Sequence, residues 1–274
     1  MREQAEAFRE ESEALYALLS PLQDADWEQP TQFKAWTLND VVAHLHAGNH
    51  SADLSLNDAA AHAEMKSEWK RIAEAEGGLT NLQMTHRWLA GLRGPALLAA
   101  WRSAAHALAD DFAVADPKKR VPWAGREMSA ISSISARLME TWAHGQELYD
   151  QLGVQRTNTD RIRNIVTLGI NTFGWTFTNR GDKPPAARPR VSLTAPSGAT
   201  WTWEAQPIDQ ADPTNFIEGS AIEFCQVVTQ VRNVADTRLR VEGDTAKLWM
   251  SLAQCFAGPP RMPPAPGTRF MRRV

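Results

Sequence analysis

The first 178 residues of the chain carry helical periodicity in nearly every segment, and the connections between these segments are short. In each segment, apolar residues recur at the three- and four-residue spacing that gives a helix one buried face. Glycine and proline mark the breaks between them. Several long helices with short connections are typical of a helix bundle. The predicted helices span 3–19, 38 to about 49 or beyond, much of 51–76, 80–92, 95–112, 129–153 and 159–178.

Individual residues mark several of the predicted helix ends. Thr37 and Asp40 have the spacing of a capping box, with Asp40 in place of the usual glutamate. Pro95 suits the first position of a helix, and Gly153 suits the position after a helix end. The segment 116–122, between two of these helices, is predicted to be a loop.

The last third of the chain has a different pattern. A proline-rich linker at 181–189 is followed by alternating segments at 190–195 and 200–204, which predict two strands around a turn. A second capping box, Ser220 with Glu223, predicts a helix, and 237–242 and 245–256 predict a further strand and helix. The fold class is therefore predicted as α+β, mainly α. The predicted domains are a helix bundle (1–155), a connecting helix and linker (156–185), a small α+β domain (186–260) and a Pro/Arg-rich tail (261–274).

Composition excludes several functional classes. The net charge is −3, so a nucleic-acid partner is not expected, and no segment is apolar enough to predict a membrane span. The charged N-terminus has no signal-peptide core, and Cys225 and Cys255 lie in apolar helical patterns that favour buried, inert thiols. We therefore expect a cytoplasmic protein. The basic residues near the C-terminus favour a solvated tail; they are Arg261, Arg269, Arg272 and Arg273.

Glu140 and His144 are four residues apart in the helix predicted from 129 to 153. This spacing puts a carboxylate and an imidazole on the same helix face, where both can bind one metal ion. The same face lies roughly opposite the apolar stripe of the helix. Spacing alone therefore favours a solvated face with a weak ion pair over a metal site.

The remaining histidines are ambiguous by themselves. His44 lies near the edge of an apolar stripe, where a histidine bonded to a backbone carbonyl is the usual explanation. His46 and His50 lie two and six residues further on, so a regular helix cannot direct all three toward one ion. The others have no helical partner at a useful spacing, and we interpret them as surface or structural residues; they are His62, His86 and His106.

Two segments together resemble a known family. They are Asp26-Trp-Glu-Gln-Pro-Thr31, followed by Trp36-Thr-Leu-Asn-Asp-Val-Val-Ala-His-Leu45, and Arg137-Leu-Met-Glu-Thr-Trp-Ala-His-Gly-Gln-Glu-Leu-Tyr-Asp150. In this order they resemble the DinB-like superfamily, and more closely its mycothiol-dependent maleylpyruvate isomerase branch. The segments 221–230 and 253–260 are similar to the smaller domain of an uncharacterised metal-binding subgroup of that branch.

The resemblance implies an N-terminal DinB-like four-helix bundle in which His44, Glu140 and His144 bind one divalent metal, zinc above all. Two imidazoles and one carboxylate leave a fourth position open, as in catalytic zinc sites. It also implies mycothiol as a thiol cosubstrate, activated for cis–trans isomerisation or thiol transfer on a small electrophile. In the isomerases, an arginine near the end of the helix that corresponds to 221–230 helps to hold the substrate carboxylate. Arg232 is the nearest match, and the C-terminal part otherwise departs from their pattern.

Other functions stay open at this stage. Arg238 and Arg240, on the polar face of the predicted strand, are weaker candidates for binding an anionic substrate, and the pattern favours a solvated strand face for this pair. A metal-dependent hydrolase and a non-catalytic metal-containing binding or stress protein are the alternatives to a thiol-dependent isomerase or transferase. Neither cysteine is a candidate nucleophile. The sequence does not distinguish a monomer from a homodimer.

Overall fold

The structure is a computed structural model that describes residues 1–123 and 126–272. It divides into two compact units, Met1–Gln151 and Leu152–Val274. The finer domain bounds drawn from the sequence stay a prediction. Within the described ranges, no helix is long and apolar enough to cross a membrane. Arg273 of the basic tail lies outside the described residues.

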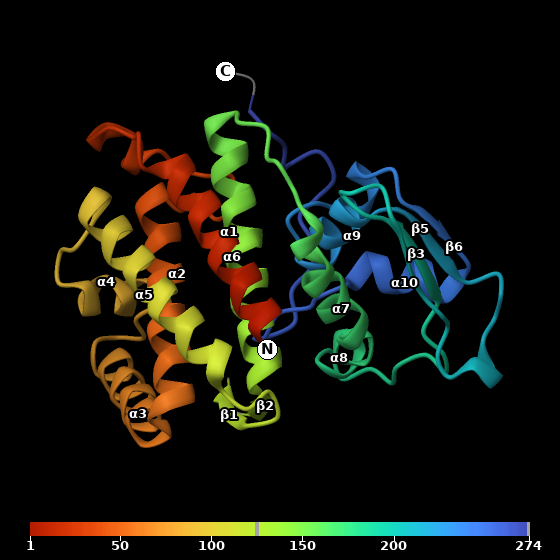
Figure 1. The fold of residues 1–274 in the computed structure, drawn as a ribbon, viewed down its shortest axis with the longest axis horizontal. Coiled ribbons are helices and arrows are strands. Elements are labelled where there is room, and N and C mark those ends of the chain that lie inside the picture. Colours follow the sequence, from red (N-terminus) through yellow and green to blue (C-terminus); the bar gives the residue numbers. More distant parts are fainter. Residues whose placement is uncertain (124–125, 273–274) are drawn as a thin grey trace. The chain divides into compact units, whose positions relative to one another are not determined.

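The first unit is a four-helix bundle with two further helices, α3 and α4, beside it (Figure 1). Helices α1 and α2 both pack against α5, while α3 and α4 pack against α2. The bundle core contains large side chains that are fully buried, among them Phe8, Trp101 and Trp142. The helices are α1 (Arg2–Leu19), α2 (Leu38–Asn57), α3 (Ala59–Ala75), α4 (Asn81–Leu89), α5 (Gly94–Val114) and α6 (Ala130–Leu152).

The predicted caps of the bundle are present. The Thr37 side chain accepts a hydrogen bond from the Asp40 backbone N–H, and the Asp40 side chain accepts one from Thr37, which makes a complete capping box. Proline occupies the first turn of α5. Asp58 separates α2 from α3 because its side chain caps α3 by accepting from the Ala61 backbone N–H.

One connection in the first unit differs from the prediction. The segment 116–122 was predicted as a loop, but β1 (Arg120–Trp123) begins inside it and pairs with β2 (Arg126–Ser129) as an antiparallel hairpin. These strands are only four residues long, too short for alternation to distinguish them from a loop.

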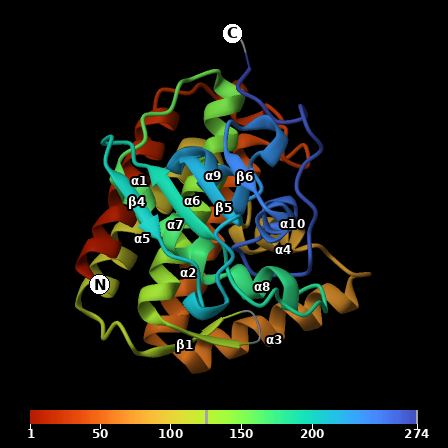
Figure 2. The same ribbon diagram turned by 90° about the vertical axis from the view of Figure 1, so that its right-hand side faces the viewer.

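The second unit combines a four-stranded sheet with short helices, which confirms the predicted mainly-α, α+β fold class (Figure 2). The strand order is β4-β3-β5-β6, with β3 and β5 parallel and the other pairs antiparallel. Helix α9 packs on β3 and β5, and α7 packs on α9. The elements are α7 (Arg163–Asn171), α8 (Phe173–Thr178), β3 (Arg190–Thr194), β4 (Thr200–Trp203), β5 (Phe216–Ser220), α9 (Ala221–Val228), β6 (Arg240–Glu242) and α10 (Asp244–Leu252).

Three predicted elements in this unit need correction. The helix predicted over 159–178 is divided at Thr172 into α7 and α8, and a short 3-10 turn precedes α7. The strand predicted over 237–242 begins only at Arg240, because a short 3-10 turn precedes it. The helix predicted over 245–256 already ends at Leu252. Strand β5 was not predicted.

Candidate metal centre

His44 comes from α2, while Glu140 and His144 come from α6. His44 lies about two turns along α2 from the capping residue Thr37. One ligand atom from each of the three side chains lies within 4.8 Å of the other two, and no further group of three or more His, Cys, Asp or Glu side chains in the described ranges meets this criterion. We call these three residues the His–Glu–His cluster.

One carboxylate oxygen is the centre of the cluster. Glu140 Oε2 lies 3.3 Å from His44 Nε2 and 3.4 Å from His144 Nε2. The two imidazole rings meet edge to face, with centroids 4.6 Å apart. Both nitrogens are therefore directed at the same oxygen, at distances longer than the roughly 2.7–2.9 Å of a good charge-assisted hydrogen bond.

The cluster is partly buried, contrary to the solvated face that spacing alone favoured. The Glu140 and His144 side chains are 19% and 12% exposed. Polar residues around the rest of α6 are also buried, including Arg137, Thr141 and Glu147. The apolar stripe predicted one buried face, whereas almost the whole circumference of the helix is covered.

Glu147 is a functional candidate that the sequence reasoning missed. Its Oε2 lies 3.1 Å from His144 Nδ1, the ring nitrogen on the opposite side from Glu140. A carboxylate on the second nitrogen of a metal-binding histidine fixes the orientation of the ring. The available signal was the three-residue spacing from His144 to Glu147 on one helix.

The charged groups of the cluster shift one another's pKa values. Burial lowers the pKa of His144, but the charges and hydrogen bonds of Glu147 and Glu140 outweigh it and raise this pKa to about 9. Burial likewise raises the pKa of Glu140, but the hydrogen bonds and charges of His144 and His44 hold it well below 4.5. The pKa of His44 is lowered, chiefly by burial. Near neutral pH and without a metal, these shifts favour an ionised Glu140 beside a protonated His144 and a neutral His44.

An aromatic loop borders the cluster. Phe33 and Trp36 flank Lys34 and Ala35, which both adopt left-handed backbone conformations with φ of 53° and 55°. The Trp36 ring lies nearly parallel to the His144 ring at 6.0 Å, and the Phe33 ring meets His144 edge to face at 5.1 Å. The Lys34 ammonium lies 4.8 and 5.1 Å from the centroids of these two aromatic rings. Non-glycine residues in this conformation carry strain, which is common beside functional sites.

The other histidines lie outside the cluster. The rings of His46 and His50 pack against Trp88, with centroids 5.3 and 4.9 Å away. The remaining three are bonded to other side chains: His62 to Ser51 at 3.2 Å, His86 to Asp40 at 2.7 Å and His106 to Glu13 at 2.5 Å.

The three candidate substrate-binding arginines belong to the second unit. Arg232 is 9% exposed, and its Nη1 donates to the Val231 carbonyl. Arg238 is almost fully exposed and faces Glu223 at 3.7 Å. Arg240 lies 3.3 Å from Glu218 and over the Phe216 ring. Their role in substrate binding stays a prediction.

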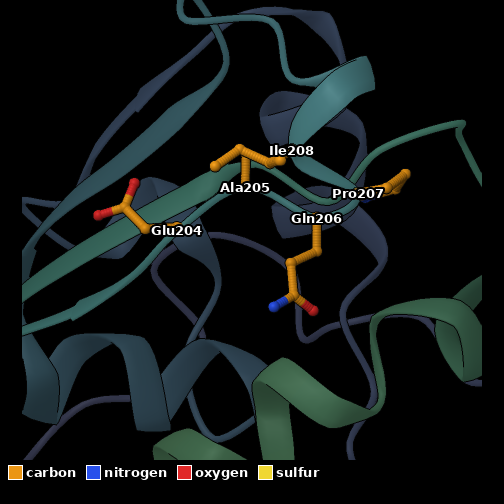
Figure 3. A pocket seen from close by; sticks show the side chains of 5 residues that line it. All are labelled: Glu204, Ala205, Gln206, Pro207 and Ile208. Atoms are coloured by element: carbon orange, nitrogen blue, oxygen red, sulfur yellow. The ribbon is translucent and has the colours of Figure 1, made fainter.

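A surface hollow in the second unit contains none of the candidate residues. It is lined by the segment 204–208 (Figure 3). The side chains of Glu204 and Gln206 point in different directions there, so they do not converge on one ligand.

The fold and the cluster define a helix-bundle protein with a potential two-histidine, one-carboxylate metal site. The family described as "Mycothiol maleylpyruvate isomerase N-terminal domain" matches residues 8–149. The chain belongs to this family, which confirms the resemblance seen in the sequence.

Relatives match nearly the whole chain. Uncharacterized proteins from two strains of Mycobacterium tuberculosis, CDC 1551 / Oshkosh and ATCC 25618 / H37Rv, are each 35% identical over 252 residues, covering 92% of this chain and 94% of theirs. Among solved structures, the mycothiol-dependent maleylpyruvate isomerase and a histidine-to-alanine mutant of it match with a TM-score of 0.50. Their identities are 16% and 18%, over 82% of this chain and 87% of theirs. At this identity the structural match supports the shared fold alone.

Proposed function

We propose that the protein binds one divalent metal ion, zinc, through His44, Glu140 and His144. We further propose that it uses this ion to activate a low-molecular-weight thiol, such as mycothiol, for reaction with a small electrophile. The reaction is cis–trans isomerisation, or thiol transfer if the thiol stays attached. Membership of the mycothiol maleylpyruvate isomerase family supports the choice of thiol.

The observation that carries the proposal is the pair of distances from Glu140 Oε2, 3.3 Å to His44 and 3.4 Å to His144. Zinc binds nitrogen and oxygen ligands at roughly 2.0–2.1 Å in a tetrahedron, which separates neighbouring ligand atoms by about 3.3 Å. The two distances therefore suit atoms that share an ion. The donor set of two imidazoles and one carboxylate is that of a catalytic zinc site with an open position.

A zinc ion in this site would supply Lewis-acid chemistry, lowering the pKa of a thiol at the open position so that the nucleophilic thiolate is present at neutral pH. The protein side chains provide the setting for it. Glu140 is the single carboxylate among the three proposed ligands, so direct coordination would neutralise only one of the two charges of the ion. Phe33 and Trp36 place an apolar border against the His144 ring.

The protein's own cysteines do not provide this thiol. Cys225 and Cys255 are both buried in the second unit, and burial raises the pKa of Cys225 well above its usual value. A buried, protonated thiol is a poor nucleophile. An external thiol is therefore part of the proposal.

The test is an assay of untagged protein, first freed of metal by a chelator and then loaded with zinc. It is mixed with mycothiol and a panel of electrophiles that includes maleylpyruvate. We expect turnover that requires both zinc and thiol. Product that retains the thiol identifies a transferase, and a geometric isomer with free thiol identifies an isomerase.

Two results would contradict the proposal. Hydrolysis of panel compounds without thiol would identify a hydrolase. Stoichiometric zinc without turnover of any substrate would favour a binding protein.

A further inference from the structure

Arg137 is a buried cation one helical turn before Glu140 on α6. Its side chain is among the largest that are fully buried in the described residues, with the whole residue 2% exposed. Its Nε donates to Asn49 Oδ1 at 3.1 Å, and its Nη2 donates to the Leu45 carbonyl at 3.2 Å. Both acceptors belong to α2, the helix that carries His44. A buried guanidinium is costly to desolvate, so these contacts need an explanation beyond packing.

The surface of α2 is shaped for this guanidinium. A Cβ atom added at Gly48 would lie 2.5 Å from Arg137 Nη1 and 2.8 Å from its Cζ, which is closer than atoms can approach. Any other residue at Gly48 would therefore displace the guanidinium. The Asn49 Nδ2 group is buried and has no hydrogen-bond partner among the described residues, so the Asn49 side chain is held from its Oδ1 end, where Arg137 donates.

These contacts bridge the two helices next to the His–Glu–His cluster. Leu45 directly follows His44 on α2, and Arg137 precedes Glu140 by three residues on α6. The planar guanidinium donates to two acceptors at once, which fixes both the separation and the register of the helices. Since His44 and Glu140 lie 96 positions apart in sequence, only tertiary contacts can hold their 3.3 Å approach.

We propose that Arg137 is a positioning residue, which bridges α6 to the Gly48 face of α2 and so holds His44 in register with Glu140 and His144. This inference rests on the proposed function for the identity of the ligands. In this proposal, Arg137 and Gly48 bring together a site whose ligands come from two helices.

The test compares Arg137→Met with Arg102→Met in the full chain. Arg102 is a matched control because it also bridges two helices, from α5 to Glu13 on α1, at 2.7 and 2.8 Å. Competition titration should show zinc binding weakened by roughly 10- to 100-fold in Arg137→Met, as for other residues that support metal ligands, and unchanged in Arg102→Met. The visible absorption of the Co²⁺-loaded protein should change only in Arg137→Met.

Further variants separate the bridge from general stability. Arg137→Lys keeps the charge but cannot bridge both acceptors, so it should restore only part of the affinity. Gly48→Ala should weaken zinc binding in the wild-type background and have little further effect in Arg137→Met, because the guanidinium that it displaces is gone. If Arg137→Met does not fold, Arg137→Lys and Gly48→Ala carry the test.

A readout on metal-free protein keeps this inference separate from the proposed function. The imidazole nitrogen resonances of His44 and His144 should shift in Arg137→Met but not in Arg102→Met. Unchanged resonances, or zinc affinity within about threefold of wild type in a folded variant, would overturn the role of Arg137. Wild-type protein that binds no zinc would instead overturn the proposed function, and the resonances would still test Arg137.

Discussion

In two clusters of the first unit, a histidine lies against a glutamate from a helix that is far away in the sequence. The two clusters differ in the distances from the carboxylate to its partners. In the surface cluster, Glu13, Arg102 and His106, the distances from the carboxylate are 2.5–2.8 Å. In the His–Glu–His cluster they are 3.3 and 3.4 Å. The Glu13 carboxylate already makes short, charge-assisted hydrogen bonds. The Glu140 oxygen instead lies from both imidazole nitrogens at about the distance that separates neighbouring ligand atoms of a zinc ion.

The difference follows from the partners of each carboxylate. Arg102 carries a permanent charge and a planar fork that occupies both oxygens of Glu13, so no cation is needed there. Glu140 instead has two imidazoles. A ring nitrogen donates to a carboxylate only while it carries a hydrogen, and it binds a metal only when it carries none. Histidine paired with glutamate is therefore not a sufficient sign of a metal site. We expect the third partner and the distances to separate the proposed metal site from the surface cluster.

The largest expected effect is the loss of metal from His144→Ala. Removing one of three protein ligands leaves only two, so we expect less than about a tenth of an equivalent of zinc by elemental analysis of untagged protein. His106→Ala is the matched control in the surface cluster and should keep the wild-type metal content. Circular dichroism should show that both variants are folded. Full metal content in His144→Ala would mean that the ligands are different residues.

The same pair of clusters shows what the sequence could predict. Periodicity and capping residues identified α6 and the start of α2, and the four-residue spacing placed Glu140 and His144 on one face of α6. Periodicity does not show whether a polar face is covered, so spacing favoured a solvated face and was wrong. Neither the 96-residue separation of His44 from Glu140 nor the 93-residue separation of His106 from Glu13 leaves a local signal.

The proposed ligand set therefore comes from the family resemblance. Of the two distant histidines, His44 lies in a segment that carries the resemblance, whereas His106 does not. The elements of the fold that needed correction also depend on features that periodicity does not reveal. The division between α7 and α8 at Thr172 interrupts an apolar pattern that continues through it, and the strands β1 and β2 are too short for alternation to be visible.

A smaller effect is expected from Glu147→Gln. The neutral amide still reaches His144 Nδ1, but it lacks the charge that orients and polarises the ring. Zinc affinity should therefore fall by about tenfold, which is the lower end of the range for residues that support metal ligands. Glu13→Gln, the matched change in the surface cluster, should leave zinc affinity unaltered. Competition titration with a chromophoric chelator measures both. Equal affinities for wild type and Glu147→Gln would assign Glu147 a purely structural role.

The smallest effect concerns the surface cluster alone and appears in the pH dependence of stability. The hydrogen bond from Arg102 is the largest influence on Glu13, and together with the contributions of His106 it outweighs the opposing effect of burial and lowers the pKa of Glu13 below 4.5 in the folded protein. A lowered folded-state pKa stabilises the protein above the unfolded value, and this contribution is lost as pH falls through the folded value. Because the group is partly exposed, we expect less than about 1 kcal/mol.

Urea unfolding of wild type and Glu13→Gln between pH 3 and 7 measures this contribution, since the difference between the two curves isolates Glu13. The free energies of unfolding should differ near pH 7 and converge as the pH falls below about 4.5. High salt should reduce the difference, because exposed ion pairs are screened. A difference that stays constant over the whole range would mean that Glu13 contributes through packing. The short distances of the surface cluster would then reflect helix contact rather than charge pairing.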